Sequence, residues 1–319
     1  MPASADPPGR TIRSRSWRLY RLQLALGAAG LGACVLAVAT GVRAVHVRPD
    51  AAHRLDVGGV GLSYPTINVA AVVVLGLAVL GAAVIAVTAT AVWGQLRAHR
   101  RLVRALPIRG PLAAHPSVLV VDAAAPLAFC AGWLRPRVYI STGVLRRLSE
   151  PELRAVLAHE QHHGALRDPL RLAVGRVLSQ ALFFLPVVRA LHDRYADAAE
   201  LRADAAALQA VDGAPGPLAS ALLVFGRGAS GEVTGISPQR VDALLGLPVA
   251  VRLPRTLLVG GLLTIAVLVA LAWRAGGSAS VQATLNLPIA TSQPCVLVLA
   301  LVPVLTCVAA AMLRRPARG

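Results

Sequence analysis

Two histidines and a glutamate stand at a spacing that suits metal chemistry. His159 and His163 are four residues apart, and Glu160 directly follows the first of them, which gives an H-E-x-x-H pattern. On a helix, side chains four residues apart project from the same face, so both imidazoles can bind one ion. Glu160 then lies beside the open position of the metal and can take a proton from water there. His162 lies off this face, and we interpret it as a solvated neighbour or as a side chain that contacts a ligand. The pattern predicts a zinc site (Zn2+) with Glu160 as the catalytic base.

A catalytic zinc site needs a third protein ligand, and the acidic residues downstream offer one. Four of the five glutamates in the chain lie between positions 150 and 200. Glu200 and Asp204 are four residues apart and share a helix face. We therefore predict Glu200 as the third ligand, with Asp204 accepting the second ring N–H of a liganding histidine. The alternative is an ordinary solvated helix face that pairs with Arg202.

Three other side chains are weaker candidates for roles at the site. Asp168 follows the motif helix, and either it pairs with an arginine or it contacts a ligand; we favour the arginine. Tyr195 and His192 are candidates for stabilising the oxyanion of the reaction.

Helices and short strands must position these residues. Ser149 caps a helix from Glu150 to about Gly164, with Glu152 reaching back to it and Pro151 in the first turn. A second helix is expected over residues 192–211, followed by short helical pieces through Leu245. Three short strands are predicted from their β-branched and aromatic content: Ser117–Val121, Pro126–Gly132 and Arg137–Ser141.

The composition is that of a membrane protein. Hydrophobic residues make up 56% of the 319 residues, and charged residues only 15%. Four segments are apolar and long enough to cross a bilayer: Leu22–Val42, Ile67–Trp93, Thr256–Trp273 and Cys295–Leu313. A fifth apolar run, Val177–Val188, has 12 residues and contains Pro186. Because it is short for a span, a core helix or a re-entrant segment is favoured over a full crossing. The first segment is too long for a signal peptide.

The arginines set the expected orientation and the domain boundaries. All 32 basic residues are arginine, and they cluster beside the apolar segments. Cytoplasmic loops carry the excess of positive charge, which places both termini and residues 94–255 in the cytoplasm. We expect two membrane helices in residues 1–93, a cytoplasmic domain in 94–255 and two membrane helices in 256–319. The net charge of +17 is explained by these flanks and not by nucleic-acid binding, because no nucleic-acid motif accompanies it. The four cysteines form no C-x-x-C pair, so neither a disulfide framework nor a cysteine zinc site is indicated.

With these residues in view, the chain resembles the transmembrane metallopeptidases of the Bla/Mec antibiotic-sensor type. The resemblance covers about residues 117–210 and rests on Leu148–His163 (LSEPELRAVLAHEQHH), Trp133–Ile140 (WLRPRVYI), Arg167–Pro169, Phe184 and Pro186, and the Glu200-x-x-x-Asp204 pair. It implies a gluzincin whose protease domain faces the cytoplasm and cleaves proteins such as a partner repressor. His159, His163, Glu200 and Glu160 fall on the family's ligand and base positions.

A near relative is the membrane heat-shock and prenyl-protein peptidase family, which shares both motifs. That family often has an Asn-Ala-Phe-Ala strand, and the equivalent Leu127–Cys130 here lacks the asparagine. The sensor type is therefore preferred. Sensors of that type also carry an extracellular penicillin-binding domain with Ser-x-x-Lys, whereas this chain contains no lysine, which excludes direct acylation by a β-lactam.

The sequence therefore predicts a mainly α-helical integral membrane protein, with about four transmembrane helices and a cytoplasmic α+β zincin-like protease domain carrying a small sheet. The predicted function is zinc-dependent endopeptidase activity on protein substrates at the cytoplasmic membrane face, in the plasma membrane of a bacterium. The alternative is a non-catalytic membrane scaffold or signalling protein with a structural or vestigial zinc site. Glu160 argues against the alternative, because a structural site does not need that carboxylate.

Overall fold

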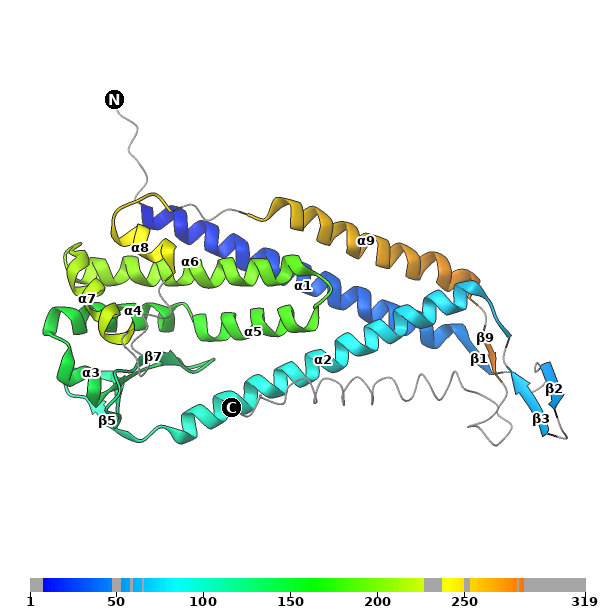
Figure 1. Ribbon diagram of the computed structural model, residues 1–319, viewed down its shortest axis with the longest axis horizontal. Coiled ribbons are helices and arrows are strands. Elements are labelled where there is room, and N and C mark those ends of the chain that lie inside the picture. The colour runs from blue at the N-terminus through cyan, green and yellow to red at the C-terminus, as the bar shows by residue number, and fades with distance from the viewer. Residues whose placement is uncertain are drawn as a thin grey trace, which may run out of the picture. The chain divides into compact units, whose positions relative to one another are not determined.

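A computed structural model describes residues 8–47, 53–57, 60–64, 66–226, 237–249, 253–279 and 281–283. Helices dominate this part of the chain, and a small four-stranded mixed sheet accompanies them (Figure 1). The fourth apolar segment of the sequence, Cys295–Leu313, lies outside the described residues.

Three described helices are long and apolar enough to cross a membrane. They are α1 (Pro8–Ala44, with the candidate span at Ser14–Ala44), α2 (Val69–Ala105) and α9 (Arg255–Ser278). Helices α1 and α9 contain the first and third predicted segments and extend beyond them. Helix α2 begins two residues after the predicted start at Ile67, which lies in a short strand, and extends beyond Trp93. Many of their large apolar side chains are exposed, among them Val72 of α2 and Val259 of α9. Such a surface is suited to lipid and not to water.

Short strands follow and precede these helices. They were not predicted, and they form a sheet of order β1-β9-β4 and a β2-β3 hairpin. Their bounds are β1 (Val45–Val47), β2 (His53–Val57), β3 (Val60–Tyr64), β4 (Thr66–Ile67) and β9 (Val281–Ala283).

The sheet beside the motif helix has the order β5-β6-β8-β7, with β6 and β8 parallel and the other pairs antiparallel. Its strands are β5 (Ile108–Leu112), β6 (His115–Val121), β7 (Ala128–Ala131) and β8 (Arg137–Ser141). Strand β8 has the predicted bounds, and β6 and β7 overlap the other two predicted strands. Strand β5 was missed because Gly110 and Pro111 interrupt it, and its register with β6 shifts at both places.

The motif lies on α4 (Glu150–Ala165), which packs against β7, β8 and the apolar helix α7 (Pro215–Gly226). Buried Leu157 of α4 joins the sheet residues Val118 and Ile140 in one core cluster. Helix α3 (Thr142–Arg147) follows β8, and α5 (Asp168–Ala181), α6 (Pro186–Ala210) and α8 (Pro238–Leu244) complete the described helices. Helix α6 begins six residues before the predicted start, because Pro186 opens the helix instead of interrupting it.

The chain divides into two compact units. One comprises Met1–Gln23, Gln95–Arg176 and Arg189–Pro254, and it contains the four-stranded sheet and α4. The other comprises Leu24–Gly94, Val177–Val188 and Arg255–Gly319. The short apolar run Val177–Val188 therefore belongs to the unit that holds the apolar parts of α1, α2 and α9.

Candidate metal centre

Helix α4 presents both motif histidines on one buried face. A capping box starts the helix, with the backbone N–H of Ser149 donating to Glu152 at 2.7 Å. His159 and His163 are each 8% exposed, and their Nε2 atoms lie 3.2 Å apart. The side chains thus converge as the four-residue spacing predicts.

Helix α6 brings the third predicted ligand to the same point. One carboxylate oxygen of Glu200 lies 3.6 Å from Nε2 of His159, and the other lies 3.5 Å from Nε2 of His163. One ligand atom from each residue falls within 4.8 Å of the others. Two imidazoles and one carboxylate form the donor set of a catalytic zinc site, and this arrangement fits one ion with a position left open.

Both histidines have a carboxylate on their second ring nitrogen. Asp204 lies 3.0 Å from Nδ1 of His159, and Asp168 lies 3.0 Å from Nδ1 of His163. Such partners hold the proton on Nδ1 and leave Nε2 free to bind a metal. Asp168 also contacts Arg202 at 3.3 Å, so both roles considered for it in the sequence are present together.

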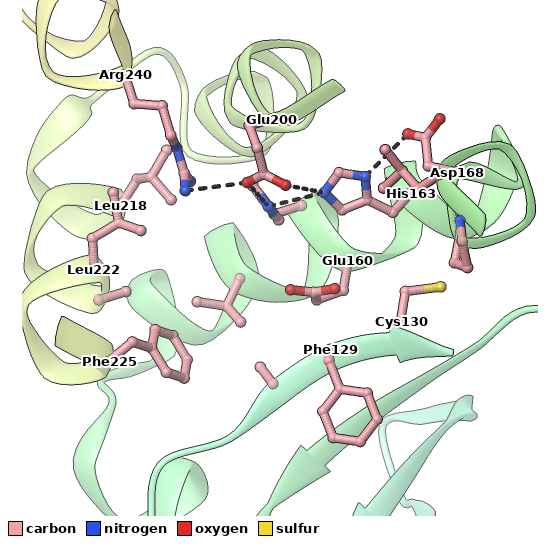
Figure 2. A pocket seen from close by; sticks show the side chains of 16 residues that line it. Phe129, Cys130, Glu160, His163, Asp168, Glu200, Leu218, Leu222, Phe225 and Arg240 are labelled. Carbon is pink, nitrogen blue, oxygen red and sulfur yellow. Dashed lines mark hydrogen bonds and ion pairs between the residues drawn. The ribbon is translucent and has the colours of Figure 1, made fainter. Parts of the chain in front are cut away.

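Arg240 is the residue of this centre that the sequence analysis missed. Its guanidinium donates to both oxygens of Asp204, at 2.7 and 2.6 Å, and lies 3.1 Å from Glu200. It comes from α8, 36 residues after Asp204, where no local spacing connects it with the motif. Figure 2 shows Arg240 and His163 on opposite sides of Glu200.

Tyr195 and His192, the two residues predicted to stabilise the oxyanion, are not among the residues that line the cavity at the metal centre. The hydroxyl of Tyr195 is fully buried and donates to Asp168 at 2.7 Å, and burial raises the pKa of that hydroxyl to about 12. Tyr195 therefore helps to hold Asp168, the carboxylate that contacts His163. His192 is partly buried, and its ring borders Gly175 of α5. His162 is also partly buried and outside the pocket lining.

The centre opens into a cavity of about 390 Å³. Glu160 faces this cavity beside β7 (Figure 2), where its carboxylate accepts a hydrogen bond from the backbone N–H of Cys130. Burial raises the pKa of Glu160 above its ordinary value, which favours a base that must gain and release a proton. Burial also raises the pKa of the Cys130 thiol to about 12, so a thiolate is not formed at neutral pH. Apolar side chains of α7 form another wall of the cavity: Leu218, Ala221, Leu222 and Phe225.

The charges around His159 predict a pH dependence for the metal-free protein. Despite burial, which opposes the charged form, Asp204 and Glu200 raise the pKa of His159 from 6.5 to about 9. Protonated His159 therefore stabilises the folded state through these carboxylates. This contribution is complete below pH 6.5 and is lost as the pH rises through about 9. We expect the unfolding temperature of chelator-treated protein to fall by several degrees over this range. Asp204→Asn should flatten the change, and a wild-type curve that stays level would contradict the assigned ion pair.

Comparison with known proteins identifies the region that holds this centre. Residues 96–230 match peptidase family M48. The match and the His-His-Glu cluster confirm the predicted class of enzyme and cofactor for this region, because M48 peptidases are zinc-dependent. No solved structure matches the chain.

Curated relatives agree with the M48 match. Protease HtpX of Psychrobacter sp. is 39% identical over 83 residues, covering 25% of this chain and 27% of the relative. Protease HtpX of Acinetobacter baylyi is 44% identical over 71 residues, covering 21% and 24%. Protease HtpX homolog 2 of Methanosarcina mazei is 38% identical over 72 residues, covering 22% and 24%. The chain thus spans about a quarter of the length of these relatives. These matches favour the membrane heat-shock and prenyl-protein peptidase family over the antibiotic-sensor type that the sequence motifs had favoured.

Proposed function

We propose that this chain is a membrane-bound zinc endopeptidase that hydrolyses peptide bonds of protein substrates at the cytoplasmic face of the plasma membrane of a bacterium. The observation that carries the proposal is the His159, His163 and Glu200 cluster, which opens into one cavity together with Glu160. The three candidate membrane helices and the arginines beside them support a membrane location with cytoplasmic termini.

The two histidines and Glu200 would hold the zinc, which when bound supplies Lewis-acid chemistry that activates water and polarises a carbonyl group. Asp204 and Asp168 keep both imidazoles in the ligating tautomer. Glu160 accepts the proton of the attacking water and delivers it to the leaving amine. Burial raises the pKa of Glu160 above its ordinary value, which favours a group that must both accept and release a proton.

Strand β7 supplies a place for the substrate backbone in this zincin-like domain. It stands at the end of the β5-β6-β8-β7 order, so its second edge carries no strand among the described residues. Ala128, Phe129 and Cys130 of this strand line the cavity. An extended peptide can pair with such an edge, as in other cases of β-strand addition. The likeness to HtpX proteases supports protein substrates. The sequence resemblance to the sensor type adds a cytoplasmic repressor as one candidate.

Metal removal tests this function directly. The purified full chain in lipid nanodiscs should contain about one zinc per chain, as three protein ligands and one open position require. Casein cleavage should stop after treatment with 1,10-phenanthroline and return when zinc is added back. Cleavage that continues unchanged in zinc-free, chelator-treated protein would overturn the proposal. Zinc binding without cleavage of casein or of membrane-protein substrates would favour the scaffold alternative.

Arg240 positions Glu200 and Asp204 in this proposal. All three of its guanidinium nitrogens contact these two carboxylates, so we expect it to act through them, although it also lines the cavity. Arg240→Gln should lower zinc affinity by about 10- to 100-fold, the usual cost of losing a partner of a metal ligand. Arg240→Lys should recover part of the loss, and added guanidinium should improve Arg240→Ala.

Chelator competition and the visible spectrum of the cobalt-substituted protein measure this effect. Arg109→Gln is the matched control, because Arg109 pairs with Asp122 on the exposed surface. If Arg240→Gln binds zinc as tightly as Arg109→Gln and gives the wild-type cobalt spectrum, Arg240 does not position the ligand.

A further inference from the structure

Helices α5 and α6 form a hairpin whose tip carries no charge. The tip is the run Val177–Val188, which contains only uncharged residues and is flanked by Arg176 and Arg189. Helix α5 ends at Ala181 and α6 begins at Pro186, so the chain turns within this run. Both flanking arginines are exposed. The chain therefore enters and leaves the tip beside a positive charge.

The tip packs against candidate membrane helices. It belongs to the compact unit that contains most of α1, and all of α9. A Cβ atom added to Gly27 of α1 would lie 2.7 Å from Leu178, and one added to Gly261 of α9 would lie 2.6 Å from Val187. Glycine at both contacts allows this close approach, which is typical of helix packing in membranes.

Positions along the helices show how far the contacts and the tip lie from the arginines that flank each apolar segment. Gly27 follows Arg21 by six residues, and Gly261 follows Arg255 by six residues. At about 1.5 Å per helical residue, both contacts lie roughly 9 Å beyond the arginine that precedes the apolar segment. Phe183 at the turn is seven residues from Arg176 and six from Arg189, so the tip reaches roughly 9–10 Å beyond its own flanking arginines. The contact residues Leu178 and Val187 lie only two residues, roughly 3 Å, beyond those arginines.

Exposure within the tip shows which side faces outward. Leu182 and Leu185 are buried against the other helices, whereas Phe183 between them is 59% exposed. An exposed phenylalanine at the depth of the acyl chains is covered by lipid at little cost. Arg176 and Arg189, at the two ends of the run, can bind anionic headgroups. A run of 12 residues with a turn is too short to cross.

We propose that Val177–Val188 is a re-entrant membrane element. It extends about 10 Å beyond its flanking arginines into the cytoplasmic half of the bilayer and returns. Phe183 lies among the acyl chains, and Arg176 and Arg189 lie at the headgroups. The inference rests on packing and charge and does not depend on peptidase activity.

Depth-dependent quenching tests this placement. All four cysteines are first replaced by serine, and single cysteines are introduced by Phe183→Cys or, as the control, Leu134→Cys. Leu134 is 75% exposed and lies between β7 and β8. Each variant is labelled with a bimane fluorophore in vesicles of phosphatidylcholine and phosphatidylglycerol. The label at position 183 should be quenched more by nitroxide lipids labelled near the headgroup than by those labelled near the chain end. The label at position 134 should be quenched by neither.

Reaction with a water-soluble maleimide provides a second measurement. Before labelling, Phe183→Cys in vesicles should react at least about tenfold more slowly than Leu134→Cys, because thiolate formation requires water. Stronger quenching by the deep nitroxide would mean that the segment crosses, which overturns the re-entrant model. Equal reactivity at the two positions would place the tip in water. Slow maleimide reaction at position 183 without quenching by either nitroxide lipid would mean that another protein segment covers this position. Disulfide formation between two chains carrying Phe183→Cys would identify that segment as part of a second copy. Either result would also overturn the proposal.

Discussion

Glu160→Gln is expected to abolish proteolysis and to leave the zinc content at the wild-type level. Glutamine is nearly isosteric and can still form hydrogen bonds, but it cannot accept the proton of water at neutral pH. Loss of a general base costs about 10²–10⁴ in rate, and more where the same group also acts as the acid. The carboxylate lies in the cavity but outside the His-His-Glu cluster, so the ion should still bind. The measurements are casein cleavage and metal content of the purified variant in nanodiscs.

Glu152→Gln is a suitable control for this experiment. Glu152 is on the same helix and accepts a hydrogen bond from the backbone of Ser149, away from the cavity. Glu152→Gln should lower the stability of the folded protein somewhat and leave the cleavage rate per bound zinc unchanged. If Glu160→Gln cleaves the same substrate at the wild-type rate, Glu160 is not the base. If both wild type and variant cleave nothing yet support the same cellular phenotype, the scaffold alternative is correct.

His163→Ala and Glu200→Ala should each abolish tight zinc binding. With one of three protein ligands gone, two remain, which is too few for a catalytic site to retain its ion. His163 contacts both Glu200 and Asp168, so its removal also takes away one of the partners of buried Asp168. We expect metal content to fall to background after brief dialysis against a chelator, together with complete loss of cleavage.

His162→Ala separates a ligand effect from a general effect on α4. His162 is next to His163 in sequence, but it does not line the cavity or belong to the metal cluster. It should therefore keep about one zinc per chain. Wild-type metal content in both ligand variants would refute the site. Equal zinc loss in His162→Ala would instead indicate that the helix itself is damaged.

The grouping of the site residues was predictable because most of it is local. His159, Glu160 and His163 occupy one helical turn, and Glu200 and Asp204 occupy one turn of another helix. Fixed helical geometry therefore converts spacing into a shared face. The first three apolar segments were equally predictable, because length and hydrophobicity alone decide whether a helix can span a bilayer.

The unpredicted parts depend on contacts between distant segments. Arg240 reaches the centre only because α8 folds back onto α6, and nothing in its neighbourhood marks it as special. Tyr195 was predicted as an oxyanion-stabilising candidate, but its hydroxyl donates to Asp168. This contact depends on how α6 packs against α5, which the local sequence does not show. Strand β5 forms through pairing with β6 despite a glycine and a proline that argue against a strand.

The charges gathered at the centre have a consequence for how the ion enters. Four carboxylates surround the imidazoles (Glu160, Asp168, Glu200 and Asp204), and two buried arginines accompany them (Arg202 and Arg240). With neutral histidines, these groups leave a formal charge of −2, which one divalent cation balances. Without the ion, protons must supply the balance, which agrees with the pKa of His159, which the neighbouring carboxylates raise despite burial. Loading with zinc is then an ion-for-proton exchange, so acidification of the surroundings competes directly with the metal.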